Sequence, residues 1–121
     1  MPELPLLDAS VLDGLVALSP GDEGAFVREL IEIFIQDTPP RVQEIEAALA
    51  RGDTVTASRA AHAIKGSCGN FGAMRLHAAS LAMERTAGGG DLAAAQALLP
   101  GLLRDHAETQ AELSRYRARL G

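Results

Sequence analysis

The sequence has few of the residues that build aromatic cores or disulfide frameworks. It contains no Trp, and aromatic residues make up 3 % of its 121 positions. The core must therefore be built from Leu, Ile, Val, Ala and a few Phe, and the abundance of Ala and Leu favours helix. The single cysteine, Cys68, cannot form an internal disulfide, so a reducing, cytoplasmic location is expected.

Long apolar runs and an excess of basic residues are also missing. No apolar run approaches the roughly 18 residues that a membrane-spanning helix needs. The start, Met1-Pro2-Glu3-Leu4-Pro5, lacks the basic and apolar segments of a secretory signal. The net charge of −5 argues against a general nucleic-acid-binding surface. We therefore expect a cytoplasmic monomer that binds neither membranes nor nucleic acid.

Helical periodicity and short turn signals cover the chain from residue 8 onward. We expect an irregular lead-in over residues 1–7 and one helical domain over residues 8–121. A short helix capped by Asp8 or Ser10 comes first. Longer helices then begin at Asp22, at Asp53 or Thr54, near residue 72, and at Asp91. No segment alternates like a strand, so the sequence predicts an all-α, antiparallel up-down four-helix bundle with a short accessory N-terminal helix.

Two proline sites fall inside predicted helices. Proline lacks an N–H and disfavours helical geometry at the preceding residue. The helix from Asp22 should therefore stop or kink near Thr38, before Pro39-Pro40, and Asp37 or Thr38 would cap a restarted helix. Pro100-Gly101 predicts a kink in the last helix.

The helix from Asp22 carries more apolar residues than one core stripe needs. Helical spacing assigns the core stripe to Phe26, Leu30, Ile33 and Phe34. Val27, Ile31 and Ile35 are left over, and they are candidates for docking a partner protein. The alternative is that a wide apolar stripe simply reflects a well-buried helix.

The helix after Asp53 carries the most informative pattern, a histidine among small residues. Its predicted buried stripe consists of Ala57, Ala60, Ala61, Ile64 and Cys68. His62, Lys65 and Gly66 are spaced three and four residues apart, so they share the other face, with Arg59 one turn earlier.

This face has the chemistry of a phosphoryl acceptor. A neutral imidazole is a good nucleophile near pH 7, because its ordinary pKa is about 6.5. Lys65 and Arg59 would offset the incoming negative charge, and Gly66 would leave room for a partner. The spacing also allows an ordinary surface histidine at position 62 and a helix end at Gly66. Ser67 would either cap that helix end or bond the phosphoryl group.

Other candidate groups point to structural roles. His77 and His106 fall in stripes that predict partial burial, and no two histidines have metal-ligand spacing on one helix. Cys68 is expected to be a small core residue. Gly88-Gly89-Gly90 lacks the spacing of a phosphate-binding loop, so the sequence predicts no ATP-dependent kinase activity of its own.

The segment His62-Ala63-Ile64-Lys65-Gly66-Ser67, followed by Gly72-Ala73, resembles the signature of histidine phosphotransfer (HPt) domains of two-component phosphorelays. The resemblance implies that His62 accepts a phosphoryl group from the phosphoaspartate of a receiver domain and passes it to another receiver. The expected partners are response-regulator receivers or a hybrid histidine kinase. No cofactor is implied in this chain, since the Mg²⁺ and the aspartate belong to the receiver.

Glu84 adds a more specific resemblance. The chain is also similar to the N-terminal phosphotransfer domain of chemotaxis histidine kinases, in which a glutamate downstream of the histidine orients its ring. Glu84 matches that glutamate, although a solvated surface carboxylate is the alternative. Counting equal numbers of residues on either side of the turn near residue 70 instead places His77 nearer the level of His62.

Three functions therefore stay open at this point. The chain is a phosphorelay carrier, a non-phosphorylated adaptor that only docks receivers, or the phosphotransfer domain of a larger sensor or chemotaxis kinase. The retained set of His62, Lys65 and Gly66 favours the carrier.

Overall fold

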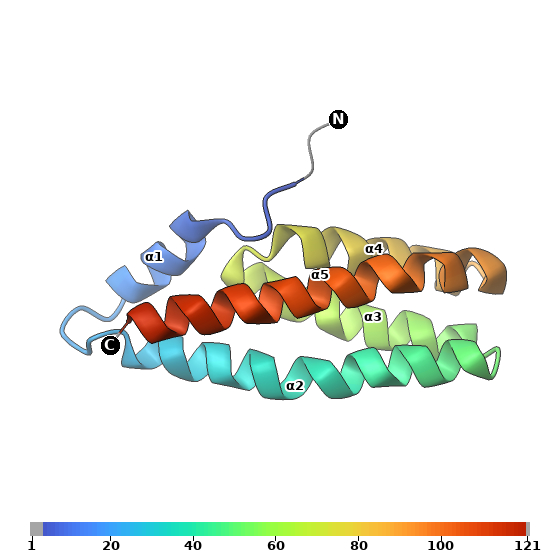
Figure 1. The fold of residues 1–121 in the computed structure, drawn as a ribbon, viewed down its shortest axis with the longest axis horizontal. Helices are drawn as coiled ribbons and strands as arrows, with labels where there is room; N and C mark the ends of the chain where they lie inside the picture. Colours follow the sequence, from blue (N-terminus) through green and yellow to red (C-terminus); the bar gives the residue numbers. More distant parts are fainter. Residues whose placement is uncertain (1–3, 121) are drawn as a thin grey trace.

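The structure, a computed structural model, describes residues 4–120 and is helical throughout its regular parts (Figure 1). Its elements are α1 (Ala9–Ala17), α2 (Ala25–Ala50), α3 (Thr54–Cys68), a 3₁₀ turn (Gly69–Phe71), α4 (Met74–Gly88) and α5 (Leu92–Arg119), and residues 4–120 contain no strand. Helices α2 to α5 each pack against the next, and α5 closes the ring by packing on α2. The predicted all-α four-helix bundle with an accessory N-terminal helix is confirmed.

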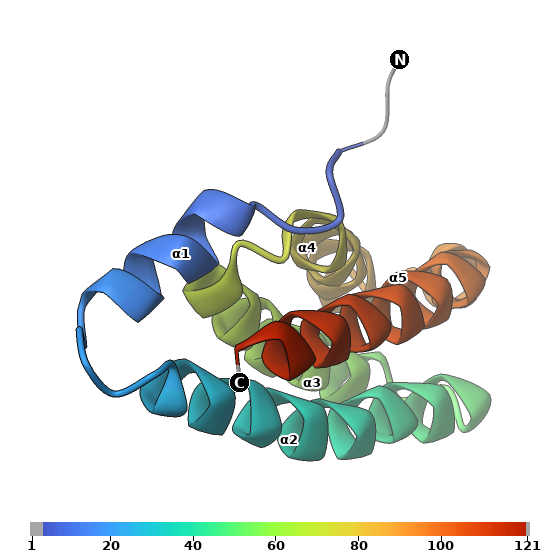
Figure 2. The same ribbon diagram turned by 60° about the vertical axis from the view of Figure 1, so that its left-hand side comes forward.

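The short helix α1 covers one end of the bundle, where α2 begins and α5 ends (Figure 2). Asp8 caps it by accepting a hydrogen bond from the backbone N–H of Ser10, at 3.1 Å. Leu12 is fully buried against the bundle, and the Tyr116 hydroxyl donates to Asp13 from α5 at 2.8 Å. Leu7, Leu15 and Val16 also pack partly buried against the core, and the backbone N–H of Asp8 donates to the carbonyl of Gly72 at 2.8 Å, so α1 is held on the bundle by apolar packing and by hydrogen bonds.

Helices α3 and α5 begin at their predicted caps. Asp53 and Asp91 accept hydrogen bonds from the backbone N–H groups of Thr56 and Ala94. Helix α2 begins at Ala25, later than predicted, because Gly24 takes a left-handed conformation with φ of 79°. Asp22 nevertheless bonds its first turn, accepting from the N–H groups of Gly24 and Phe26.

Helix α2 continues through Pro39 and Pro40, so the predicted stop and restart are wrong. Pro39 cannot donate to the carbonyl of Ile35, four residues earlier. The side-chain amide of Gln110, on α5, donates to that carbonyl instead, at 3.3 Å. A neighbouring helix thus supplies a hydrogen bond that the proline removes, which local sequence rules do not anticipate.

The buried face of α2 is adjacent to the predicted one. Val27, Ile31 and Phe34 are at most 2 % exposed, whereas Phe26 and Ile33 are 41 % and 48 % exposed. The assignment of Phe26 and Ile33 to the core was therefore wrong. Val27 and Ile31 belong to the core and are not docking residues, and Ile35 packs half-buried against it.

A buried hydrogen-bond network explains why this face of α2, and not the adjacent one, is in the core. Thr38 is 1 % exposed, and its hydroxyl donates to the carbonyl of Phe34 at 2.9 Å. Its oxygen then accepts from the ring Nε2–H of His106 at 2.9 Å and from Gln110 at 3.2 Å. Because these bonds satisfy the hydroxyl, a polar residue can occupy the core position between Phe34 and Val42.

His106 is buried, as predicted, and makes the stability of the fold depend on pH. Burial lowers the pKa of His106 below its ordinary value of 6.5. The unfolded chain therefore binds this proton more readily, and we expect the free energy of unfolding to fall as pH drops below about 6.5. Chemical unfolding at pH 7.5 and 5.5 measures this. His106→Gln keeps a donor for Thr38 without the titration, so its pH slope should be smaller; an equal slope would contradict the assignment.

Candidate functional site

The sequence of α3 separates a small-residue buried face from an exposed one. Its predicted buried stripe is confirmed, since each member is at most 1 % exposed: Ala57, Ala60, Ala61, Ile64 and Cys68. The alanines keep α3 close to both α2 and α4. Burial raises the pKa of the Cys68 thiol to about 12, which leaves it an unreactive core residue.

The exposed face of α3 carries His62, whose ring is held from α4 by Glu84. The Glu84 carboxylate oxygen Oε2 lies 2.5 Å from Nδ1 of His62, and Oε1 lies 2.6 Å from Nζ of Lys65. An ionised carboxylate only accepts hydrogen bonds, so the ring proton is on Nδ1. Nε2 therefore carries the free lone pair on a side chain that is 66 % exposed.

Glu84 is ionised throughout the neutral range. The hydrogen bond from Lys65 is the largest cause that lowers the pKa of this carboxyl; the bond from His62 also lowers it, while desolvation acts in the opposite direction. A lowered carboxyl pKa means that the bridge is present at neutral pH and is lost only as pH falls through the lowered value. The bridge thus fixes a negative charge between the imidazole and the ammonium group.

Ser58 ties the two helices together at this level, a contact that the sequence interpretation missed. Its hydroxyl donates to the backbone carbonyl of Glu84 at 2.9 Å. A Cβ added to Gly88, one turn farther along α4, would lie 3.2 Å from the same hydroxyl oxygen. Ser58 lies one turn before His62 on α3, so its spacing from the histidine is the signal that could have identified it.

Gly66 lies inside α3, so helix termination does not explain it. The helix ends at Cys68, and the chain reverses at Gly72, whose φ of 61° favours glycine. A Cβ added to Gly66 would meet no other atom within 4 Å. The position is open to solvent beside His62.

Arg59 and Ser67 lie on either side of this face. Arg59 is exposed one turn before His62, and its side chain makes no hydrogen bond or ion pair with another residue in the described part of the chain. Ser67 donates to the carbonyl of Ala63 in its own helix, at 3.3 Å.

His77 is exposed on α4, so its predicted partial burial is wrong. The residue of α4 that contacts His62 is Glu84, so the residue count that placed His77 nearer the level of His62 is also wrong. His62 precedes the end of α3 by six residues, which is about 9 Å at 1.5 Å per residue. The three-residue 3₁₀ turn carries the chain about 6 Å farther before α4 starts. The chain must therefore run back about 15 Å along α4 before it is beside His62 again. At about 1.5 Å per residue this is ten residues after Met74, the position of Glu84.

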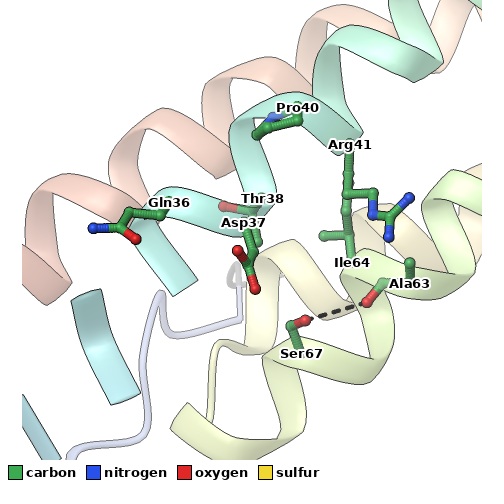
Figure 3. A pocket seen from close by; sticks show the side chains of 8 residues that line it. All are labelled: Gln36, Asp37, Thr38, Pro40, Arg41, Ala63, Ile64 and Ser67. Carbon is green, nitrogen blue, oxygen red and sulfur yellow. Dashed lines mark hydrogen bonds between the residues drawn. The ribbon is translucent and has the colours of Figure 1, made fainter. Parts of the chain in front are cut away.

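An open groove lies between α2 and α3, next to the exposed face. One hollow of about 380 Å³ lies between Asp37, Pro40 and Arg41 of α2 and Ala63 and Ser67 of α3 (Figure 3). A smaller hollow of about 70 Å³ continues toward the 3₁₀ turn and shares Asp37 and Ser67 as lining residues.

Neither a metal site nor a membrane segment is found in the part of the chain that the structure describes. Residues 4–120 hold no group of three or more His, Cys, Asp or Glu side chains placed to bind a metal ion. None of the helices described is both long and apolar enough to cross a membrane.

The fold and the site together define a class of protein: a four-helix bundle that presents one oriented histidine to solvent. The family model of the Hpt domain matches residues 29–119, and the chain belongs to this family. Hpt domains are phosphotransfer carriers rather than kinases, and they interact with receiver domains of response regulators.

Two solved structures are similar over nearly the whole chain. The histidine-containing phosphotransfer protein B (HptB) from Pseudomonas aeruginosa PAO1 is 31 % identical, with a TM-score of 0.85 over 97 % of this chain and 98 % of that one. A rice protein assigned as a histidine-containing phosphotransfer protein shares the fold at 18 % identity, with a TM-score of 0.76 over 95 % of this chain and 84 % of its own. No curated protein matched the sequence.

Proposed function

We propose that this chain is a phosphorelay carrier in which His62 takes a phosphoryl group from the phosphoaspartate of one receiver domain and gives it to another. The observation that carries the proposal is the 2.5 Å contact between Glu84 Oε2 and His62 Nδ1, which leaves Nε2 as the exposed nucleophile. Membership of the Hpt family supports the same conclusion.

The transfer needs no proton from the chain. The Nε2 lone pair of His62 attacks phosphorus in line, the N–P bond forms, and the P–O bond to the aspartate breaks so that the carboxylate leaves. The proton stays on Nδ1, where the Glu84 carboxylate stabilises the positive charge that develops on the ring. Mg²⁺ held by the receiver would supply charge neutralisation on the phosphoryl oxygens.

Lys65 supplies positive charge close to His62, on the same face of α3. Its ammonium group is 2.6 Å from Glu84 Oε1, one helix turn from His62, so it is already positioned when the phosphoryl group arrives. Arg59 adds charge from the preceding turn, and its exposed side chain is free to turn toward the phosphoryl group. We assign Ser67 a structural role, because its hydroxyl bonds its own helix.

Incubating the protein with a phosphorylated receiver domain tests the proposal. The expected result is label on this chain that is acid-labile and alkali-stable, as expected of phosphohistidine, and that chases onto a second, unphosphorylated receiver. ATP alone should give no label. Receiver binding without label on the wild-type chain would contradict the carrier and support the adaptor.

Removing the Glu84 carboxylate should slow the transfer. In Glu84→Ala, Nδ1 of His62 loses its acceptor, so the ring samples both tautomers and orientations, and we expect the transfer rate to fall about 10-fold. Nitrogen NMR of the imidazole should show the loss of a single tautomer. Glu108→Ala, which removes an exposed carboxylate on α5 that pairs with Arg75, is the control. An unchanged rate and tautomer in Glu84→Ala would contradict the orienting role.

A further inference from the structure

The groove beside the exposed face of α3 contains an acidic side chain without a partner. Asp37 is exposed, and its side chain makes no hydrogen bond or ion pair with any other residue in the range 4–120. Its carboxylate points into the groove from α2, toward Ser67 (Figure 3). The neighbouring polar groups are engaged elsewhere, since Arg41 pairs with Glu44 at 3.8 Å and Ser67 bonds Ala63.

An apolar strip leads along α2 to this carboxylate. Phe26 and Ile33 are 41 % and 48 % exposed, and Leu30 between them is half-buried. With Asp37 they repeat every three or four residues, so they share one side of α2. Leu30, Ile33 and Asp37 all line the smaller hollow together with Ser67 of α3. The strip is therefore continuous with the helix that carries His62.

A partner that covers this strip removes water from Asp37. A carboxylate that loses water without gaining a partner costs free energy, whereas one that meets a cation at an interface does not. The apolar strip and the carboxylate thus fit a partner surface that combines apolar side chains with one basic group. A partner that lacks the basic group is disfavoured, which is the physical basis of discrimination.

We infer that Asp37 determines which receiver domain docks on this chain, by accepting a Lys or Arg side chain of a receiver whose apolar surface covers Phe26 and Ile33. This inference rests on the proposed function, since it takes the partner to be a receiver. Asp37 acts on docking and does not touch the reacting atoms of His62.

Charge reversal at Asp37 tests the inference against a matched control. Asp37→Lys and Glu46→Lys make the same change in charge on α2. Glu46 is exposed nine residues farther along, which places it on the opposite side of the helix. The probes are the receiver domains of the source organism, each activated with beryllofluoride for binding or phosphorylated for transfer. Phosphoramidate, a small phosphoryl donor that needs no docking, reports the competence of His62 separately.

The expected result is a loss that appears only with the receivers. Asp37→Lys should weaken binding and transfer about 10-fold for the receiver that the wild-type chain prefers. Glu46→Lys should bind that receiver like wild type, and both variants should be labelled by phosphoramidate at the wild-type rate. Reversing the matching basic residue of the receiver to Asp should restore binding to Asp37→Lys.

The outcomes that overturn the inference differ from those that overturn the carrier function. If wild type and Asp37→Lys bind the receiver equally, only the role of Asp37 is refuted and the carrier function is not. A wild-type chain that binds a receiver but is never labelled refutes the carrier, while the binding comparison still decides the role of Asp37. A wild-type chain that binds none of the receivers refutes both.

Discussion

Replacing His62 by Gln is expected to remove all phosphoryl acceptance and leave the fold unchanged. Gln has no nucleophilic nitrogen, because its amide lone pair is delocalised, so neither a phosphorylated receiver nor phosphoramidate should label the variant. The His62 side chain is 66 % exposed, and its one hydrogen bond, to Glu84, is a contact that the amide of Gln can also make. The free energy of unfolding should therefore stay within about 0.5 kcal/mol of wild type.

His77→Gln is the matched control for this experiment. His77 is also an exposed histidine of the bundle, and nothing places it near Glu84 or Lys65. Its replacement should leave labelling by both donors at the wild-type level. Label retained by His62→Gln would show that another residue accepts the phosphoryl group. Binding of receivers should persist in His62→Gln, since the groove between α2 and α3 is unchanged.

The part of the site that lies on one helix could be predicted from the sequence. His62, Lys65 and Gly66 share a face because of helical spacing, and the small buried residues opposite them are unambiguous. The first turns of α3 and α5 were predictable for a similar reason, since Asp53 and Asp91 act through bonds to residues three positions away. All of these features depend on local geometry.

Features that depend on contacts between helices were not predictable in the same way. The apolar residues of α2 fit two adjacent faces equally well, and the choice between them depends on Thr38, which is buried because α5 supplies its partners. The continuation of α2 through Pro39 depends on Gln110 of the same distant helix.

The Glu84 contact falls between these two cases. Family resemblance suggested it, whereas counting residues across the turn suggested His77, because the count ignored the length of the 3₁₀ turn. That turn sets the level at which α4 meets α3. A short connection therefore decides which carboxylate contacts the histidine. Asp37 was not identified as a separate site for a related reason, since the groove that it lines forms only where α3 lies beside α2.

Filling Gly66 should change stability and transfer in opposite directions. Gly inside an exposed helix is unfavourable, so Gly66→Gln should raise the free energy of unfolding by about 0.5 kcal/mol. No atom lies within 4 Å of the added Cβ, so nothing in the chain opposes the new side chain. The side chain does stand one turn from His62, where a receiver must bring phosphorus within bonding distance of Nε2. A displacement of about 1 Å can cost about 100-fold in rate, and we expect a loss of that size.

Gly14→Gln is the control, because Gly14 is also a helical glycine with no atom within 4 Å of an added Cβ, but it lies on α1. It should share the gain in stability and keep wild-type transfer. Phosphoramidate should label Gly66→Gln nearly as fast as wild type, since a small donor does not need the space. If receiver transfer survives in Gly66→Gln, partner access is not the reason for the glycine. If phosphoramidate labelling also fails, the added side chain obstructs His62 itself, and the loss of receiver transfer is then not evidence that the glycine provides partner access.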